Sequence, residues 1–405
     1  MEIGIIGGGA AGMTAAIEAA RLGAKVTIFE HMPRIGKKLL LTGSGKCNIS
    51  NIQMDTSHFH GSGISFIDDL FSKCPKEEVY NFLSYLGIVM KDRNGYLYPY
   101  SENAASVLDS FRFALRDLKV NILTEVNITK IESKNGIFKI NFNESSLTFD
   151  RIILACGSKS YKNTGSDGSG YDLAKRFGHK IIKPLPALTS LNCKEDFYPS
   201  IAGIRTKAKI SLFSKDVVNS IYEEVGELQI NKTGISGIPV FNSSFRVAQL
   251  LEKKELPFMV IDFLPDYSEE DLKNILINRI ENFPNRNIEE LMTGILNKNL
   301  CLLLLRLCGF KMDNIIKSLN DKDILKLIKL IKSFKTNISS TGNFESSQVT
   351  CGGVDCDSIS NCLQSKLING LYFAGEILDV NGDCGGYNLH FAFMTGLIAA
   401  RNCIK

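Results

Sequence analysis

The first thirty residues alternate between apolar runs and small residues. Residues 2–6 are mostly apolar, residues 7–12 read Gly-Gly-Gly-Ala-Ala-Gly, and apolar positions then recur at helical spacing up to Gly23. A second apolar run, residues 25–29, is closed by the acid Glu30. This pattern predicts a strand, a glycine turn, a helix and a second strand, which is the order of a dinucleotide-binding βαβ unit.

The pattern over residues 31–178 predicts more elements of an α/β domain. A basic, glycine-bearing loop, residues 36–48, follows the second strand. Apolar positions three or four residues apart then indicate helices, and short apolar runs indicate strands. The predicted elements are helices at 64–71, 77–86, 103–118 and 171–177, strands at 120–123 and 151–155, a hairpin over 128–142 turning at Asn135-Gly136, and a glycine-rich turn at 165–170.

The pattern changes at about Leu188. Segments 207–213, 217–225 and 258–263 alternate like half-buried strands, and we predict no helix between them. Alternation of this kind is typical of an antiparallel β domain. Residues 268–334 open on the cap-like sequence Ser-Glu-Glu-Asp and keep helical periodicity, so we expect a helical subdomain after the strands.

Residues 323–335 have a strongly amphipathic pattern. Isoleucine and leucine recur three and four residues apart, with lysines on the opposite face. A helix lying on a membrane surface has this pattern. A helix packed against its own subdomain has it too, and we favour that second interpretation.

Near the C-terminus the sequence again has the buried apolar runs that are typical of strands in a parallel sheet. Residues 370–376 predict a buried strand that ends in glycine and an acid, and residues 385–388 open a final helix through Ala400. The first domain is therefore expected to be interrupted and then completed by the end of the chain. The predicted division is 1–188 for its first part, 189–265 for an inserted β domain, 266–335 for a helical subdomain, 336–350 for a return through the β domain, and 351–405 for the completing part.

Composition and charge narrow the class of protein. The net charge is +4 with 22% charged residues, so the protein lacks the strong electrostatic field that would predict binding to nucleic acid or to an anionic membrane. The eleven cysteines are scattered and odd in number, which favours reduced thiols. The chain starts directly with a predicted strand, and its most apolar run, residues 300–307, is interrupted by Arg306. We expect a cytoplasmic protein without a membrane span.

The glycine turn has the chemistry of a dinucleotide site. Gly7 permits the tight turn, Gly9 lets a pyrophosphate approach the backbone, and Gly12 lets helix and sheet pack closely. The helix N-terminus then directs N–H groups at the phosphates. Glu30 is placed to accept the hydroxyls of an adenosine ribose, and its charge repels a 2′-phosphate. The site therefore fits FAD or NAD and not NADP.

Three later segments favour FAD. Cys156-Gly157 follows an apolar strand, Gly375-Glu376 ends another, and Gly385-Gly386 opens a helix whose N–H groups suit the flavin pyrimidine. This discontinuous arrangement is expected for large FAD domains. The predicted fold is α/β, a Rossmann-type FAD-binding domain with an inserted antiparallel β domain and a helical subdomain. The predicted FAD-binding residues are Gly7, Gly9, Ala10, Ala11, Gly12, Glu30, Lys37, Lys38, Thr42, Gly43, Gly45, Cys47, Asn48, Val126, Ala155, Cys156, Gly157, Gly375, Glu376, Gly386, Tyr387, Asn388 and Leu389.

Several other motifs do not support a site. The loop at 43–47 lacks the first glycine and the Ser/Thr of a triphosphate-binding loop. Cys351 and Cys356 lie in predicted strand and turn, without a helix start to lower a thiol pKa. Gly234 to Gly237 predicts a turn, with a backbone approach to the flavin as the alternative. No metal site is expected, because no four-ligand spacing occurs around His31, His58, His60, His179 or His390, and the pair His58 and His60 is predicted to be a solvated loop.

The glycine-bearing turns, loops and strand ends along the chain, taken together, resemble those of one known family. It is the BaiN-like family of FAD-dependent oxidoreductases, also called aminoacetone-oxidase-like, and the resemblance covers essentially the whole chain. It implies an FAD domain of the two-dinucleotide-binding type that carries an inserted β domain with a helical appendage. The segments that carry it are 7–30, 36–38, 42–51, 165–171, 234–237, 352–354, 365–367 and 371–389.

The chain departs from the family pattern at a few positions. The family usually has Ala-Thr-Gly-Gly where residues 155–158 read Ala-Cys-Gly-Ser, and Phe-Thr-His where residues 230–232 read Ile-Asn-Lys. Ile238 stands where a proline is expected, and His390 where glutamine is usual. FAD binding rests mainly on backbone contacts, so these changes bear on substrate chemistry instead.

The leading functional hypothesis is an FAD-dependent oxidoreductase that transfers a hydride between a small organic substrate and the flavin. The resemblance implies reduction of an activated C=C bond, and the sequence has no second GxGxxG motif, so NAD(P)H is expected as a transient donor. The alternatives are an amine oxidase that uses oxygen, a tRNA-associated flavoprotein, and a flavin sensor without turnover. The oligomeric state stays open. Candidate catalytic residues are Cys47, Asn48, Asn388 and His390.

Overall fold

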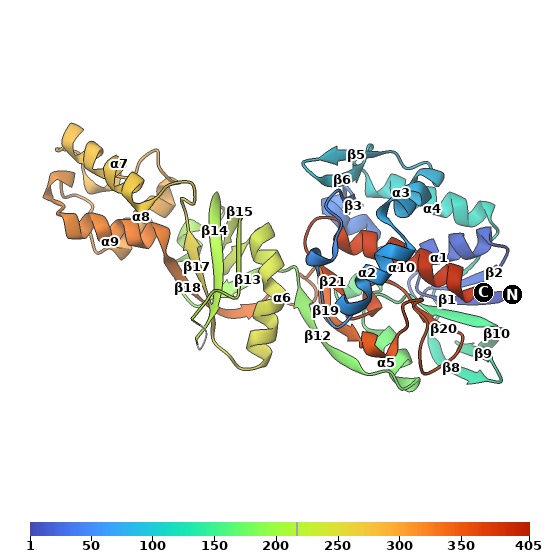
Figure 1. The fold of residues 1–405 in the computed structure, drawn as a ribbon. Coiled ribbons are helices and arrows are strands. Elements are labelled where there is room, and N and C mark those ends of the chain that lie inside the picture. Colours follow the sequence, from blue (N-terminus) through green and yellow to red (C-terminus); the bar gives the residue numbers. More distant parts are fainter. Residues whose placement is uncertain (216–217) are drawn as a thin grey trace. The chain divides into compact units, whose positions relative to one another are not determined.

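The computed structural model describes residues 1–215 and 218–405 and divides them into two units (Figure 1). Unit 1 comprises Met1–Leu185 and Phe344–Lys405, and unit 2 comprises Pro186–Asn343. The chain therefore leaves the first unit once and returns to complete it.

Unit 1 is built on a parallel sheet with the strand order β20-β11-β1-β2-β7. The strand β1 lies between β2 and β11, so the chain first adds β2 and β7 on one side of β1 and then β11 and β20 on the other. In open α/β sheets, ligands bind beyond the carboxyl ends of the strands at such a switch point. The strands are β1 (Glu2–Ile6), β2 (Lys25–Phe29), β7 (Asn121–Leu123), β11 (Arg151–Leu154) and β20 (Leu371–Phe373).

Two helices from opposite ends of the chain pack together against this sheet. The helix α1 (Ala10–Arg21) lies beside α10 (Tyr387–Cys403), as Figure 1 shows. The contact is close, because a Cβ built on Gly396 would lie 2.7 Å from the carbonyl oxygen of Ala11. Most of α10 is buried, which explains why it is apolar on all sides. The end of the chain thus completes the domain that the first residues begin.

The helices and the hairpin predicted in unit 1 are confirmed, and the structure adds short strands that were not predicted. The hairpin of β8 and β9 turns at Asn135 and Gly136, whose φ values are 53° and 78°, as a two-residue turn of this kind requires. The helices are α2 (Ile64–Lys73), α3 (Lys76–Tyr85), α4 (Ala104–Asp117) and α5 (Ser169–Arg176). The strands are β3 (Ser50–Asn51), β4 (Phe59–His60), β5 (Met90–Arg93), β6 (Tyr96–Pro99), β8 (Ile128–Lys134), β9 (Ile137–Phe142), β10 (Ser145–Phe149), β12 (Ile181–Ala187), β19 (Val349–Val354) and β21 (Asn381–Gly382).

Unit 2 contains a closed antiparallel barrel with the strand order β13-β16-β15-β14-β17-β18. The prediction of an antiparallel β domain in this part of the chain is therefore confirmed. Val217, the predicted start of one strand, lies outside the described residues, and the strand β15 begins at Tyr222. The barrel strands are β13 (Leu191–Cys193), β14 (Arg205–Ser214), β15 (Tyr222–Asn231), β16 (Gly234–Ser236), β17 (Pro257–Asp262) and β18 (Phe334–Thr341).

Two predictions for the barrel were wrong. The helix α6 (Ile238–Glu252) lies between β16 and β17, where no helix was predicted. Gly237, whose φ of 109° ends the strand, is the N-cap of this helix, and Pro239 occupies its first turn, where the missing N–H is no loss. Residues 234–236 form the strand β16 instead of a turn, since the barrel supplies partners for them on both sides.

A helical subdomain follows the barrel strand β17. It consists of α7 (Glu269–Asn282), α8 (Lys298–Leu307) and α9 (Asp321–Lys332). The predicted cap is confirmed, because Ser268 and Asp271 form a reciprocal capping box. The apolar face of α9 is buried in the core of unit 2, as the packed-helix interpretation predicts. Among the described residues, no helix combines the length and apolar character that crossing a bilayer requires.

Candidate functional site

The turn between β1 and α1 forms a cradle that side chains would fill. A Cβ on Gly7, whose φ is 106°, would lie 2.4 Å from the carbonyl oxygen of Ala155, and one on Gly12 would lie 1.9 Å from that of Gly7. A Cβ on Gly9 meets nothing within 4 Å. Gly7 and Gly12 are thus required by packing, whereas Gly9 borders open space at the N-terminus of α1. This arrangement fits the pyrophosphate of a dinucleotide such as FAD.

Glu30 is held at the end of β2 beside that turn. One carboxylate oxygen accepts the N–H of Gly8 at 2.9 Å, and the other accepts the N–H of Met32 at 2.9 Å. The carbonyl of Glu30 accepts the N–H of Val126 at 3.0 Å. A ribose in the predicted position would meet a carboxylate whose orientation is already set.

The ends of β11 and β20 reach the same cradle. Gly7 packs against Ala155 and Cys156, and Gly375 has a φ of 77° with its Cβ position 2.7 Å from the Cβ of Ala11. Burial raises the pKa of the Cys156 thiol to about 12, so it is not a thiolate at neutral pH. Three predicted segments, far apart in sequence, therefore meet at one helix start.

A partly buried ion pair lies beside the turn that follows β20. Lys38 Nζ lies 2.7 Å from a carboxylate oxygen of Glu376 and donates to the hydroxyl of Ser160 at 2.7 Å. Lys37 differs, because its Nζ donates to the carbonyl of Asn163 at 2.9 Å in an exposed position. Of the two predicted lysines, Lys38 alone pairs with a predicted acid.

The loop of residues 42–48 is locked onto the start of α10. Gly43 and Gly45 have φ values of 56° and 84°, and the N–H of Cys47 donates to the carbonyl of Thr42 at 2.9 Å. The Asn48 amide, oriented so that both its atoms have partners, donates to the carbonyl of Ser50 at 3.0 Å and accepts the N–H of Gly386 at 3.2 Å.

Tight packing and the side chain of Asn388 also fix the start of α10. A Cβ on Gly386, whose φ is 94°, would lie 2.4 Å from the carbonyl oxygen of Ser50. Asn388 accepts the N–H of Gly382 at 2.8 Å and donates to its carbonyl at 2.9 Å. Tyr387 is buried, and Leu389 packs partly buried against the core. The N–H groups of the first turn of α10 point out of the helix, as any helix start requires.

The four candidate catalytic residues have partners or surroundings that suit a structural role. Cys47 is fully buried, which raises its thiol pKa to about 11. His390 is also fully buried: its Nδ1 lies 2.9 Å from the hydroxyl of Ser50, Nε2 has no partner in the described residues, and burial lowers its pKa to about 3. The amides of Asn48 and Asn388 bind backbone groups. At neutral pH, Cys47 is a thiol and His390 a neutral imidazole.

The structure reveals a polar cluster that sequence reasoning missed. Asp383 binds two imidazoles, with its carboxylate oxygens 3.2 Å from Nδ1 of His58 and 2.8 Å from Nε2 of His60. The three side chains are 28%, 15% and 17% exposed for His58, His60 and Asp383, so the prediction of a solvated loop was wrong. The antiparallel pairing of β4 with β21 brings these residues together. The sequence around residues 58–60 gives no indication that this segment pairs with β21.

Cys351 and Cys356 are buried in β19 and in the short turn after Asp355, and burial raises both thiol pKa values to about 12. They are inert structural thiols, as predicted. Within residues 1–215 and 218–405, no group of three or more His, Cys, Asp or Glu could hold a metal ion.

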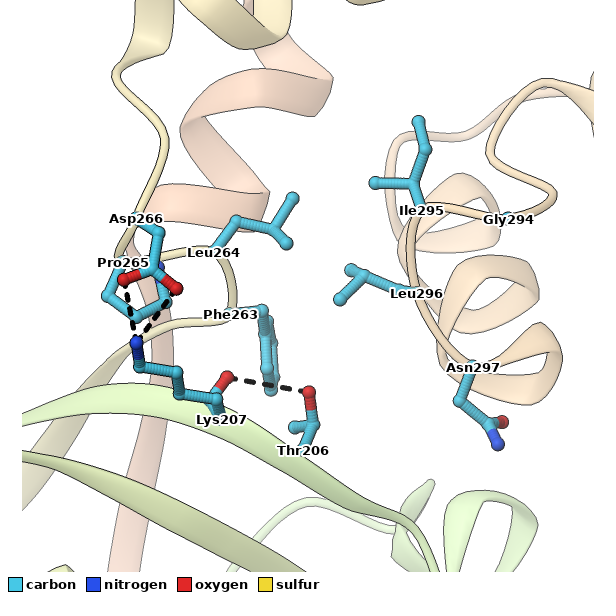
Figure 2. Close-up of a pocket in the computed structure, with 10 residues that line it drawn as sticks. All are labelled: Thr206, Lys207, Phe263, Leu264, Pro265, Asp266, Gly294, Ile295, Leu296 and Asn297. Atoms are coloured by element: carbon cyan, nitrogen blue, oxygen red, sulfur yellow. Dashed lines mark hydrogen bonds and ion pairs between the residues drawn. The ribbon is translucent and has the colours of Figure 1, made fainter.

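A cavity of about 380 Å³ lies in unit 2 (Figure 2). Phe263, Leu264, Ile295 and Leu296 form much of its wall, and Lys207 Nζ pairs with Asp266 at 2.7 Å on one side. None of its lining residues belongs to the predicted FAD site.

Comparison with known proteins gives the family. The family model described as "HI0933-like protein Rossmann domain" matches residues 1–402. A 3-dehydro-bile acid delta(4,6)-reductase of Clostridium scindens is 40% identical over 405 residues, which cover 99% of this chain and 98% of that protein. A ribosomal RNA dihydrouridine synthase of Haemophilus influenzae is 27% identical, covering 98% of this chain and 96% of that protein.

The solved structures agree with the fold. A 3-ketosteroid-Δ4-(5α)-dehydrogenase from Rhodococcus jostii RHA1 superposes with a TM-score of 0.53 at 14% identity, over 100% of this chain and 97% of that one. The glycine cradle, the converging strand ends and the family match point to one conclusion. The chain belongs to the HI0933-like family and is an FAD-dependent oxidoreductase of Rossmann-type fold.

Proposed function

We propose that this enzyme saturates a C=C bond conjugated with a carbonyl group in a small, steroid-like substrate, with NAD(P)H as a transient hydride donor. The observation that carries the proposal is the 40% identity, over nearly the full length of both chains, to a protein named as a bile acid delta(4,6)-reductase. The sequence contains one GxGxxG motif, which leaves a second nucleotide to dock only transiently.

The two kinds of relative have one type of reaction in common. A delta(4,6)-reductase and a dihydrouridine synthase are both named for reducing a ring double bond, and in uracil that bond is conjugated with a carbonyl. Bound FAD would supply the hydride in such a reaction. The protein's share is to bind, to orient, and to provide a proton.

We assign the FAD contacts to the convergent elements of unit 1. The open space at Gly9 and the N-terminus of α1 suit the pyrophosphate, and the fixed carboxylate of Glu30 suits the adenosine ribose. The pair of Lys38 and Glu376 lies beside the turn after β20, where the ribityl region is expected. The start of α10, at Gly386, suits the negative charge that a reduced flavin pyrimidine carries.

The test is an anaerobic titration of the purified yellow protein with NADH and then with NADPH. The proposal predicts bleaching of the flavin by one of them, followed by return of the colour when a 3-oxo-Δ4,6 bile acid is added. No bleaching by either nucleotide would refute the NAD(P)H donor. Reduction by an amine, with colour restored by oxygen alone, would favour an amine oxidase.

A second candidate function is dihydrouridine synthesis in ribosomal RNA. The full-length match to a protein of that name favours it, whereas the net charge of +4 lacks the strong basic character typical of RNA binding. Incubating the reduced enzyme with unmodified ribosomal RNA and with the bile acid separates the two. Dihydrouridine in the RNA, with no reduced bile acid, would replace the first proposal by the second.

A further inference from the structure

The polar cluster of His58, His60 and Asp383, at the end of the β4–β21 ladder, has the organisation of a proton-transfer site. A carboxylate only accepts hydrogen bonds, so the contact with Asp383 requires a proton on Nδ1 of His58. Nε2 of His58 is then the nitrogen that gains or gives up a proton. This is how a carboxylate sets the tautomer and orientation of a catalytic imidazole. The ring of His58 also stacks on Tyr387 at 4.3 Å between centroids, which holds its plane.

The backbone around this cluster is fixed as well. The N–H of Asp383 donates to the carbonyl of His58 at 2.9 Å, and His60 lies opposite Asn381 in the β4–β21 ladder. Tyr387 is the first residue of α10, so the cluster adjoins the helix start that we assign to the flavin pyrimidine. These contacts hold His58 in place before any ligand binds.

Asn381 provides an independent sign of a bound ligand. Its side chain is 1% exposed, and neither atom of its amide has a hydrogen-bond partner among the described residues. Leaving such a buried group unpaired destabilises the folded protein, so a ligand that supplies its partners is favoured. The imide edge of a flavin offers one donor beside one acceptor, the complement of an amide. Because Asn381 and His60 are paired across the ladder, their side chains lie on the same face of it.

We propose that His58, oriented by Asp383, donates the proton that completes the reduction, and that Asn381 binds the flavin edge beside it. The assignment of His58 rests on the function proposed above. The hydride adds to the carbon β to the carbonyl, and the electron pair of the C=C bond moves toward the oxygen as an enolate. The imidazolium form of His58, with a proton on each nitrogen, gives its Nε2 proton to the α carbon and becomes the neutral Nδ1–H ring. The substrate gains two electrons, the reduced flavin loses two, and water reprotonates the imidazole.

Stopped-flow mixing of dithionite-reduced enzyme with a 3-oxo-Δ4,6 bile acid tests the proton donor. H58Q should slow flavin reoxidation by about 100- to 10,000-fold with unchanged flavin absorbance. D68N is the matched control, because Asp68 is an exposed acid that contacts Thr56, and it should keep the wild-type rate. Partial recovery of H58A with added imidazole would support proton transfer. A wild-type rate in H58Q, or a large loss confined to H60Q, would overturn the assignment.

Two readouts do not depend on turnover, so they separate failure of this inference from failure of the proposed reaction. The chain has five histidines, so ¹⁵N spectra of labelled protein can identify His58 by its absence in H58Q. In the neutral ring, the form left after proton transfer, we expect the Nδ1–H tautomer, and we expect D383N to lose this preference. A neutral wild-type ring with its proton on Nε2 alone would refute the role of Asp383. Titration of apoprotein with FAD should show about 10-fold weaker binding in N381L, and unchanged affinity would refute the contact of Asn381 with the flavin.

Discussion

Gly9→Ala adds one methyl group where the structure has open space. The backbone at Gly9 is extended, with φ −80° and ψ −172°, which alanine adopts without strain, and a Cβ there meets no atom within 4 Å. The change should therefore alter the stability of the apoprotein by no more than about 0.5 kcal/mol. The same methyl group would occupy the approach of the pyrophosphate to the N-terminus of α1.

The expected effect on FAD binding follows from the contact that the methyl group prevents. Loss of one hydrogen bond to a charged group costs about 1.5–3 kcal/mol, or about 10- to 150-fold in Kd. The assay is titration of apoprotein with FAD, followed by quenching of flavin fluorescence, with urea unfolding of the apoprotein alongside. Wild-type affinity for FAD in a folded Gly9→Ala protein would refute the placement of the pyrophosphate.

Gly12→Ala is the matched comparison, since it adds the same methyl group three residues later. There the Cβ would lie 1.9 Å from the carbonyl oxygen of Gly7, so α1 must move away from β1. We expect the apoprotein itself to be destabilised by about 3 kcal/mol or more, because backbone cannot yield as a side chain does. If the two variants had equal unfolding midpoints, the packing argument for Gly12 would be wrong.

Other predictions concern charge and thiols. Lys38→Met should lower the free energy of unfolding by about 1–3 kcal/mol, because it leaves the part-buried carboxylate of Glu376 without its ion-pair partner. A double-mutant cycle with Glu376→Gln should show coupling between the two changes, and additive effects would contradict the prediction. The pKa of His390 is 6.5 in the unfolded chain and about 3 in the folded protein, so below pH 6.5 the unfolded state binds the extra proton. The free energy of unfolding therefore falls as the pH drops below 6.5, by up to about 1.4 kcal/mol per pH unit. His390→Gln should flatten that slope in urea unfolding between pH 5 and 6.5, and an unchanged slope would count against it. Cys47, with a pKa of about 11, should resist iodoacetamide at pH 8 until the protein unfolds, while the partly buried Cys362 reacts first by mass spectrometry; prompt labelling of native Cys47 would contradict its burial.

The sequence was sufficient where the signal is local. The order of strand, glycine turn and helix over residues 2–21 is read from spacing, because a Gly with positive φ and a helix start need only their neighbours. The same holds for the hairpin at Asn135-Gly136 and for the capping box of Ser268 with Asp271. The interruption of the first unit could also be inferred from the sequence, since buried parallel strands are apolar runs at both ends of the chain.

Local reasoning failed where partners are distant in sequence. The helix α6 was missed because its small and polar residues, such as Ser243 and Ser244, are buried only by the surrounding barrel of unit 2. His390 looked like a candidate for chemistry until burial made it a neutral group bound to Ser50. In each case the surroundings of the residue in the folded protein, and not its type, determined its structural role.

The cluster of His58, His60 and Asp383 is the clearest example of this division. The family, the cofactor class and the fold follow from motifs of a few residues, because backbone geometry at glycine turns and strand ends is specified locally. The meeting of two imidazoles with one carboxylate depends on a ladder between β4 and β21, whose residues are more than 320 positions apart. Hydrogen bonds act over about 3 Å in space and ignore separation along the chain. Only the tertiary structure could therefore bring His58, His60 and Asp383 together.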